Sequence, residues 1–166
     1  MKVILVAALS ADGFIGRTAD HHADWTGSAD KKLFVKLTKE AGVMVMGRAT
    51  FNTIGRALPE RRTIVYTRQP NSITVPGIDT TQLEPAELLR QLKDDGYTRV
   101  AICGGSQIYG LFMKAGLVTD LYLTYTPIVF GRGIPLFDQP LAARLKLINT
   151  QDLGEEAVLH HYELQS

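Results

Sequence analysis

Residues 100–114 read VAICGGSQIYGLFMK, which places a short strand, a pair of glycines and a helix in direct succession. The first four residues are apolar and β-prone, as in a buried strand, and the helix is predicted to begin just after the glycines. The same order recurs at Val43–Met46, which Gly47 closes before a short helix predicted over residues 49–54. Strands that alternate with helices in this way predict an α/β fold with a mainly parallel sheet.

The other elements follow from similar patterns. Val3–Leu9 is a continuous apolar run, typical of a strand covered on both faces. Ser10–Gly27 has no periodicity and is predicted to be a long loop, of the kind that is usually functional or disordered. Ser28 is predicted to cap a helix that Gly42 ends.

The helix-poor C-terminal third indicates that the last strands run antiparallel. Further strands are predicted over residues 63–67, 121–126, 145–150 and 158–164, a helix over 85–94, and a loop or edge strand over 69–75.

Composition limits the class of protein. The chain has 166 residues and a mass of 18.3 kDa, so residues 1–166 are interpreted as one domain. A content of 45% hydrophobic and 21% charged residues excludes an intrinsically disordered chain. The net charge of +1 creates no global field that would favour nucleic acid or an anionic membrane.

The chain has a single cysteine, Cys103, which cannot form an internal disulfide. It has no apolar run near the about 18 residues that a membrane helix needs. We therefore expect a soluble, cytoplasmic protein. We interpret Cys103 as a buried apolar residue rather than a nucleophile.

Two strand-to-helix turns could bind a phosphate. At Gly104–Tyr109 a helix start presents free backbone N–H groups, although a glycine pair is often only a tight turn. Arg48 and Thr50 follow one predicted strand, and Thr67 and Arg68 follow another. The carboxyl ends of parallel strands share one edge, so these four side chains could converge on one phosphate. The alternative, that they are unrelated surface groups, carries equal weight.

Asp30 lies in the first turn of the helix after Ser28, where the helix dipole alone favours an acidic residue. Alternatively, Asp30 and Phe34, four residues apart on one helix face, line a cleft behind the long loop. An acid in an apolar cleft has its ionised form disfavoured, which suits proton delivery or recognition of a protonatable ligand. Spacing alone favours the structural explanation.

Five groups of residues occur in one order along the chain. They are Val6–Leu9 with Asp12 and Ile15-Gly16; Trp25 with Asp30 and Phe34; Met46–Phe51 with Ile54–Arg61; Ile102 with Gly104-Gly105 and Ile108-Tyr109; and Leu121–Thr124. Together they resemble the dihydrofolate reductase family. The resemblance implies a three-layer α/β fold: a mainly parallel central sheet, antiparallel C-terminal strands and helices on both faces.

The resemblance also implies an NADPH-dependent oxidoreductase of one-carbon metabolism, which transfers hydride to pterin C6 of dihydrofolate while N5 gains a proton. Asp30 is implied to bind the amino-pyrimidine edge and to assist protonation, with Thr124 in support and Trp25 as a third catalytic residue. Arg61 is implied to bind the glutamate carboxylate of the substrate. The implied substrate contacts are Val6, Ala8, Asp30, Phe34, Ile54, Leu58, Arg61, Cys103 and Thr124.

The implied cofactor is NADPH, and two arginines near its phosphates favour it over NADH. The implied cofactor contacts are Ala8, Ile15, Gly16, Gly47, Arg48, Ala49, Thr50, Tyr66, Thr67, Arg68, Cys103, Gly104, Gly105, Ser106, Gln107, Ile108 and Tyr109. No metal is implied. The expected partners are the small-molecule substrate and antifolates such as methotrexate, with no nucleic acid and no membrane, in a monomer or homodimer.

Some features depart from the family pattern. The segment RTADHHAD at residues 17–24 is longer than in typical bacterial members, and Lys31 stands where an apolar residue is expected against the substrate. Residues 116–118 and 127–137 look more like the reductase of riboflavin biosynthesis, which shares the fold and NADPH but reduces a ribosylamino-pyrimidine phosphate. That activity, another pterin reductase and a non-catalytic NADPH-binding module therefore stay open, although Asp30 and Arg61 fit a folate.

Overall fold

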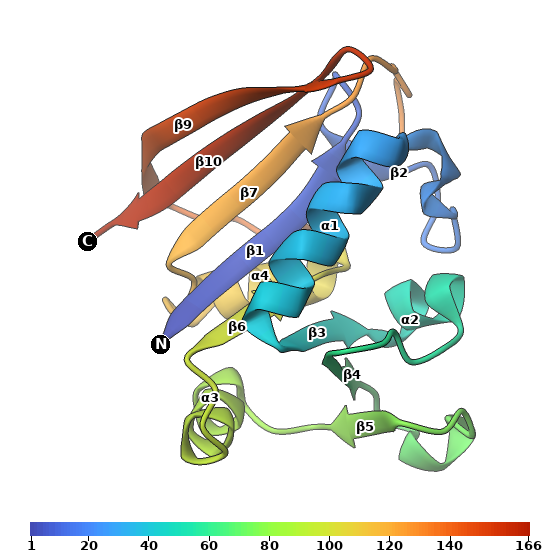
Figure 1. Cartoon of the computed structure of the whole chain (residues 1–166), viewed down its shortest axis with the longest axis vertical. Helices are drawn as coiled ribbons and strands as arrows, with labels where there is room; N and C mark the ends of the chain where they lie inside the picture. Colours follow the sequence, from blue (N-terminus) through green and yellow to red (C-terminus); the bar gives the residue numbers. More distant parts are fainter.

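An eight-stranded sheet runs through the molecule in the computed structural model, which describes residues 1–166 (Figure 1). Its strands lie in the order β5-β4-β3-β6-β1-β7-β10-β9. They are β1 (Lys2–Leu9), β3 (Val43–Gly47), β4 (Arg62–Tyr66), β5 (Ile78–Thr81), β6 (Arg99–Ile102), β7 (Asp120–Tyr125), β9 (Arg144–Gly154) and β10 (Ala157–Gln165). Two short strands, β2 (Phe14–Gly16) and β8 (Ile134–Pro135), pair separately.

Strand direction changes after β7. All neighbouring pairs from β5 to β7 are parallel, whereas β10 pairs antiparallel with both β7 and β9. The prediction of a mainly parallel sheet with antiparallel C-terminal strands is therefore confirmed. The parallel arrangement brings the carboxyl ends of β1, β3, β4 and β6 to one edge of the sheet, where ligands bind in open α/β folds.

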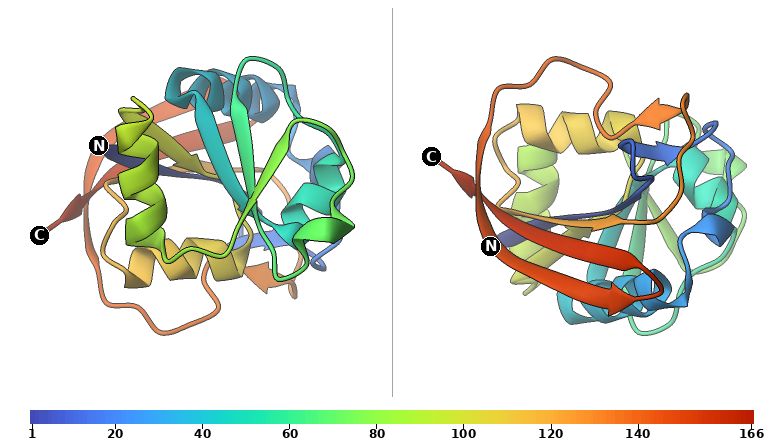
Figure 2. Two further views of the ribbon diagram at one scale, coloured as in Figure 1. Left: turned by 90° about the horizontal axis from the view of Figure 1, so that it is seen from below. Right: turned by 90° about the horizontal axis from the view of Figure 1, so that it is seen from above.

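Helices cover both faces of the sheet, as the two views of Figure 2 show. The helices are α1 (Ser28–Ala41), α2 (Arg48–Ile54), α3 (Pro85–Asp94) and α4 (Ser106–Lys114), with 3-10 turns at Ala23–Trp25 and Pro70–Ser72. Buried residues of α1 and α2 pack in one core, and those of α3 and α4 pack in the other. The central strand β1 contributes to both cores. Its Leu5 and Leu9 belong to the core under α3 and α4, whereas its Ile4 and Val6 belong to the core under α1 and α2. Burial on both faces explains its uninterrupted apolar sequence. None of the helices has the length and apolar character needed to span a bilayer.

The prediction of one long loop over Ser10–Gly27 is wrong in part. The segment contains β2 and the 3-10 turn at Ala23–Trp25. Strand β2 forms because Phe14 and Gly16 pair with β8, which lies far along the chain. A partner so distant leaves no periodicity in the local sequence.

The start of α1 also differs from its prediction. Gly27 occupies the cap position with a φ of 88°, and Ser28 is the first helical residue. The Ser28 hydroxyl donates instead to the side chain of Glu155, at the tip of the β9–β10 hairpin. At the other end, the predicted stop at Gly42 is confirmed by its left-handed φ of 77°.

One strand was not predicted and another is longer than predicted. Residues 69–75 form a loop with the second 3-10 turn, one of the two predicted alternatives, and the edge strand is β5, at Ile78–Thr81. Strand β5 is short and largely polar, and it exists through its parallel pairing with β4. Strand β9 extends beyond the predicted residues 145–150 at both ends, because β10 pairs with it along its length.

Candidate active site

A cavity of about 1520 Å³ opens at the edge where the parallel strands end. The ends of four strands contribute to its wall through Ala8, Gly47, Tyr66 and Cys103. All of the site residues predicted from the sequence line this cavity except Leu58, Arg61 and Thr124. The fold therefore brings together two groups of predicted residues, those near Asp30 and those near the glycine pair.

Asp30 occupies the first turn of α1, with Phe34 one turn further along the same cavity wall. Burial raises the pKa of the Asp30 carboxyl, and it outweighs the opposing effects of hydrogen bonding with Thr26 and Thr124 and of the Lys31 charge. The carboxyl therefore keeps its proton to a higher pH than an exposed aspartate does. A carboxyl that keeps its proton to a higher pH is better suited than an exposed one to supply that proton to a bound ligand.

Thr124 lies behind Asp30 rather than on the cavity wall. It is buried on β7 and pairs in register with Ala8 of β1. Its hydroxyl lowers the pKa of Asp30 by hydrogen bonding. The sequence prediction that Thr124 supports Asp30 from a neighbouring strand therefore agrees with the geometry, while its catalytic role stays a prediction.

Arg61 and Leu58 lie outside the lining. The Arg61 guanidinium donates to the Thr38 hydroxyl at 2.7 Å and to the Pro59 carbonyl at 2.9 Å. Thr38 follows Phe34 by one turn of α1, so Arg61 is fixed beyond the apolar wall of the cavity. Leu58 packs, half-buried, against the core under α1 and α2. Their contacts with a substrate tail remain predictions.

Lys31 lines the same cavity with an exposed side chain. Its ammonium group makes no ion pair, and it lowers the pKa of Asp30 only as the smallest of the contributing effects. The structure thus places this unusual residue on the ligand side of α1.

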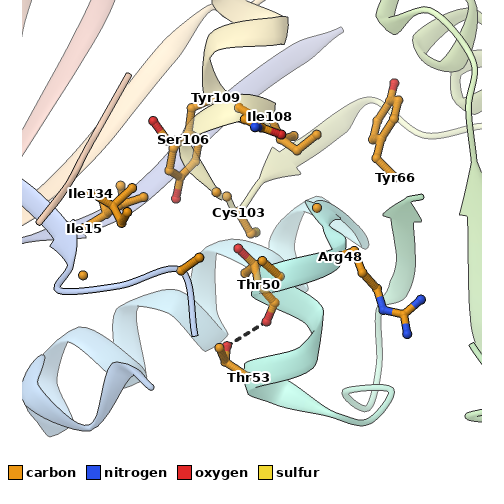
Figure 3. A pocket seen from close by; sticks show the side chains of 18 of the residues that line it. Ile15, Arg48, Thr50, Thr53, Tyr66, Cys103, Ser106, Ile108, Tyr109 and Ile134 are labelled. Atoms are coloured by element: carbon orange, nitrogen blue, oxygen red, sulfur yellow. Dashed lines mark hydrogen bonds between the residues drawn. The ribbon is translucent and has the colours of Figure 1, made fainter. Parts of the chain in front are cut away.

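The glycine pair and the start of α4 form the centre of the cavity wall (Figure 3). A Cβ atom at Gly104 would lie 3.2 Å from Thr50 Oγ1, and one at Gly47 would lie 3.0 Å from Ile108 Cγ1. Glycine therefore allows the two strand-to-helix turns to meet closely. The Ser106 hydroxyl is buried at the first residue of α4 and has no hydrogen-bond partner.

These groups fit the pyrophosphate of a dinucleotide. The first turn of α4 offers free N–H groups and the positive end of the helix dipole, and Ser106 adds an unused hydroxyl. Tyr109 anchors the same helix, because its phenol donates to the Val6 carbonyl at 2.6 Å. Burial raises the pKa of that phenol well above its usual value, so it stays a neutral donor.

The far end of the cavity carries positive charge. Arg48 begins α2 and donates to Asn52 Oδ1 at 2.9 Å and to the Ser72 hydroxyl. Both partners are neutral, so the guanidinium charge is not compensated by an acid. Arg68 and Thr67 follow β4 and line the same end. The predicted convergence of these side chains on one edge is confirmed, and their contact with a phosphate remains a prediction.

Near Asp30, His21 and Trp25 of the long loop line the cavity and pack on Phe130. The Trp25 and Phe130 rings lie 4.9 Å apart, the His21 and Phe130 rings 5.6 Å apart, and the Arg17 guanidinium stacks 4.3 Å from Phe130. The buried Trp25 indole N–H has no hydrogen-bond partner. Trp25 therefore presents an unused donor in a wall of the cavity.

Sequence reasoning missed some of the lining. Ile134 of β8 stands beside Ile15 in Figure 3, since Gly16 pairs with Ile134. The segment from Thr81 to Pro85 also lines the cavity. The position of this segment depends on β5, and the sequence pattern of β5 was too weak for that strand to be predicted.

Comparisons with known proteins agree with this architecture. The family model for dihydrofolate reductase matches residues 2–130. The chain is 32% identical to the dihydrofolate reductase of Staphylococcus haemolyticus, over 75% of this chain and 69% of that one. It is 30% identical to the enzyme of Bacillus subtilis, over 97% of this chain and 90% of the relative.

Solved structures show the same fold in two kinds of reductase. Dihydrofolate reductase from Enterococcus faecalis, complexed with NADP(H), superposes with a TM-score of 0.73 at 23% identity, covering 99% of this chain and 97% of that one. A deaminase/5-amino-6-(5-phosphoribosylamino)uracil reductase from Thermotoga maritima gives a TM-score of 0.78 at 14% identity. The match covers 99% of this chain and 56% of that enzyme.

The fold and the dinucleotide-sized cavity at its carboxyl edge define an α/β reductase of the kind that uses NADPH. More particularly, the chain belongs to the dihydrofolate reductase family. NADPH, the cofactor expected from the sequence, is the cofactor of that family.

Proposed function

We propose that the protein is a dihydrofolate reductase, acting as one domain over residues 1–166. The observation that carries the proposal is the Asp30 carboxyl: it faces the cavity from the start of α1, and its pKa is raised by burial. Both forms of this group are useful for a pterin. The ionised form pairs with N–H donors of an amino-pyrimidine edge, and the protonated form is a nearby source for N5.

NADPH, when bound, supplies the hydride that reaches pterin C6. The chain's own residues would hold it along the carboxyl edge: Ser106 and the start of α4 at the pyrophosphate, and Arg48, Thr67 and Arg68 at the adenosine phosphates. Ala8, Ile15 and Cys103 would border the nicotinamide. Binding both ligands in one cavity fixes their orientation, which is a large part of what a protein contributes to such a reaction.

Asp30 and the loop over Ser10–Gly27 would manage water and protons. Asp30 would hold the ring edge and keep a proton, or a water that relays it, close to N5. Trp25, which lines the cavity and packs on Phe130, would limit the entry of bulk water at this end. Phe34 and Ile54 would pack the ring from the apolar wall.

A second function is favoured by one specific observation. Lys31 lines the cavity beside Asp30 and lacks an acidic partner, which suits an anionic group close to the carbon that would accept the hydride. The pyrimidine phosphate of riboflavin biosynthesis carries such a group, whereas the carboxylates of a folate lie at the far end of its tail.

The test is NADPH oxidation by the purified protein, followed through the absorbance of the reduced nicotinamide. Turnover with dihydrofolate that methotrexate abolishes would support the proposal. Turnover only with the ribosylamino-pyrimidine phosphate would replace it with the second function. Saturable NADPH binding without oxidation by either compound would instead indicate a binding module.

A further inference from the structure

The tip of the β9–β10 hairpin touches the start of α1, as the view from above in Figure 2 shows. Glu155 and Glu156 both have left-handed backbone angles, with φ of 57° and 62°, which makes a tight turn between two strands. The Glu155 carboxylate accepts a hydrogen bond from the Ser28 hydroxyl and another, at 3.3 Å, from the Ala29 N–H. A distant part of the chain thus caps this helix.

Gly27 gives the carboxylate room. A Cβ atom at that position would lie 2.6 Å from a Glu155 carboxylate oxygen, so a larger residue would force the carboxylate to shift, and the φ of 88° also favours glycine. The residue in the N-cap position provides no side-chain hydrogen bond of its own. The first-turn N–H groups of α1 would otherwise face solvent, and a carboxylate is the group that satisfies them best.

We propose that Glu155 is a positioning residue for Asp30: from the hairpin tip it fixes the first turn of α1 and so sets both the place and the proton affinity of the Asp30 carboxyl. The inference rests on the proposed function, in which Asp30 acts on the substrate. Ser28, Ala29 and Asp30 are consecutive, so the capped turn is the turn that carries the catalytic carboxyl.

Glu155 and Asp30 compete for the positive end of the α1 dipole. Glu155 occupies that end and withdraws its N–H groups from other anions. Without the carboxylate, the free N–H groups and entering water would both stabilise ionised Asp30, so its proton affinity would fall. Hydrogen bonding at the start of α1 in turn lowers the pKa of Glu155, which keeps the cap charged at neutral pH.

Other charges near the two carboxyls do not depend on the hairpin contact. Lys31 acts on Asp30 from its own helix, the Asp30 charge acts on the Tyr109 phenol of α4, and Cys103 lies in the same cavity wall. Lys32 acts on Glu155. None of these groups is held in place by Glu155 through a hydrogen bond, so substitution at the hairpin tip isolates the cap.

The experiment compares Glu155→Gln with Glu156→Gln. The second variant removes the same charge from the neighbouring residue, whose side chain makes no hydrogen bond or ion pair. NMR of side-chain carboxyl carbons follows the Asp30 titration, and amide hydrogen exchange follows Ala29. We expect Glu155→Gln to lower the Asp30 midpoint by about half a pH unit and to speed exchange at Ala29. Turnover above that midpoint should fall about threefold, with the KM for dihydrofolate nearly unchanged.

The control variant should leave all three readouts as in the wild type. Ser28→Ala, which removes one hydrogen bond without a change of charge, should speed exchange at Ala29 with a smaller shift of the midpoint. Equal shifts in the two glutamine variants, or no shift in Glu155→Gln, would overturn the proposal. If the wild type fails to reduce dihydrofolate, the proposed function falls, whereas titration and exchange still decide whether Glu155 controls Asp30.

Discussion

Charged side chains are paired with one another at the amino edge of the parallel sheet and unpaired at its carboxyl edge. At the amino edge, Arg62 opens β4 and pairs with Asp79 at 2.6 Å and with Asp95 at 3.1 Å. Asp120 begins β7, and only 2% of its side chain is exposed. Its carboxylate is hydrogen-bonded to His161 Nε2 at 2.8 Å and accepts a hydrogen bond from the Thr119 hydroxyl at 2.6 Å. It also forms an ion pair with Lys2. Charges at this edge are matched within the protein.

At the carboxyl edge the charged groups have no such partners. Asp30, Lys31, Arg48 and Arg68 all line the cavity, and none of them forms an ion pair. Burial raises the pKa of Asp30, whereas at Asp120 burial is outweighed by the hydrogen bonds and charges around it and the pKa is lowered. The carboxyl edge therefore keeps its charges available for ligands.

The largest expected effect comes from removing the uncompensated acid. Asp30→Asn should reduce turnover about 10²–10⁴-fold, the range that a positioned proton donor contributes. NADPH affinity should not change, because in the proposed function Asp30 acts on the substrate. Pre-steady-state hydride transfer and NADPH fluorescence titration measure the two quantities, and full turnover near neutral pH would remove Asp30 from the mechanism.

The same variant should gain stability. Because the pKa of Asp30 is raised in the folded protein, the folded state binds more protons than the unfolded state between pH 3.8 and the raised value. The wild type therefore loses stability as pH rises through that window and stays less stable above it. Urea unfolding should show Asp30→Asn to be more stable than the wild type at neutral pH, with the advantage gone below pH 3.8.

At the amino edge, removal of an acid should reduce stability rather than increase it. Asp120→Asn should lower the free energy of unfolding by about 1–3 kcal/mol, since buried donors lose a charged acceptor. The lowered pKa of Asp120 means that its contribution is present above its ordinary value of 3.8 and is lost as pH falls below it. The deficit in urea unfolding should therefore shrink in acid. A turnover loss as large as that of Asp30→Asn would break the distinction between the two edges.

Much of the carboxyl edge was predictable from sequence because its signals are local. Gly47 and Gly104-Gly105 end strands and precede helices, and the parallel order then brings those turns together. Asp30 could be placed in the first turn of a helix for the same reason. Its role came from the resemblance, because helix spacing alone favours a structural explanation for an acid at that position.

What sequence could not predict depends on contacts between distant segments. The cap on α1 is supplied by Glu155, and only the β9–β10 register brings that carboxylate to Ser28. Strand β2 exists through β8, and β5 through β4. None of these partners leaves a periodic pattern in the segment that it stabilises.

Substitution of Arg48 tests whether an unpaired charge at the carboxyl edge binds the cofactor. Arg48→Ala should weaken NADPH binding about tenfold and NADH binding much less, because an uncompensated guanidinium would bind the additional phosphate. Arg62→Ala, at the opposite edge, is the matched control: it should leave both affinities unchanged and cost at most about 1 kcal/mol of stability. Calorimetric titration with the two cofactors measures the difference. Equal losses for NADPH and NADH in Arg48→Ala would reject the phosphate contact.

The smallest expected effect distinguishes the two candidate substrates. Lys31 favours ionised Asp30, so Lys31→Leu should raise the pH at which turnover begins to fall, in the opposite direction to Glu155→Gln. Because the ammonium group is exposed and screened by water, we expect a change of less than about twofold in turnover at neutral pH. The KM for dihydrofolate should stay the same or improve, since leucine adds apolar contact near the ring, whereas a phosphorylated pyrimidine should lose several-fold. A dihydrofolate KM that rises sharply in Lys31→Leu would mean that the residue binds an anionic part of the substrate itself, and that the unpaired charge at this edge is used at the ring as well as at the cofactor phosphates.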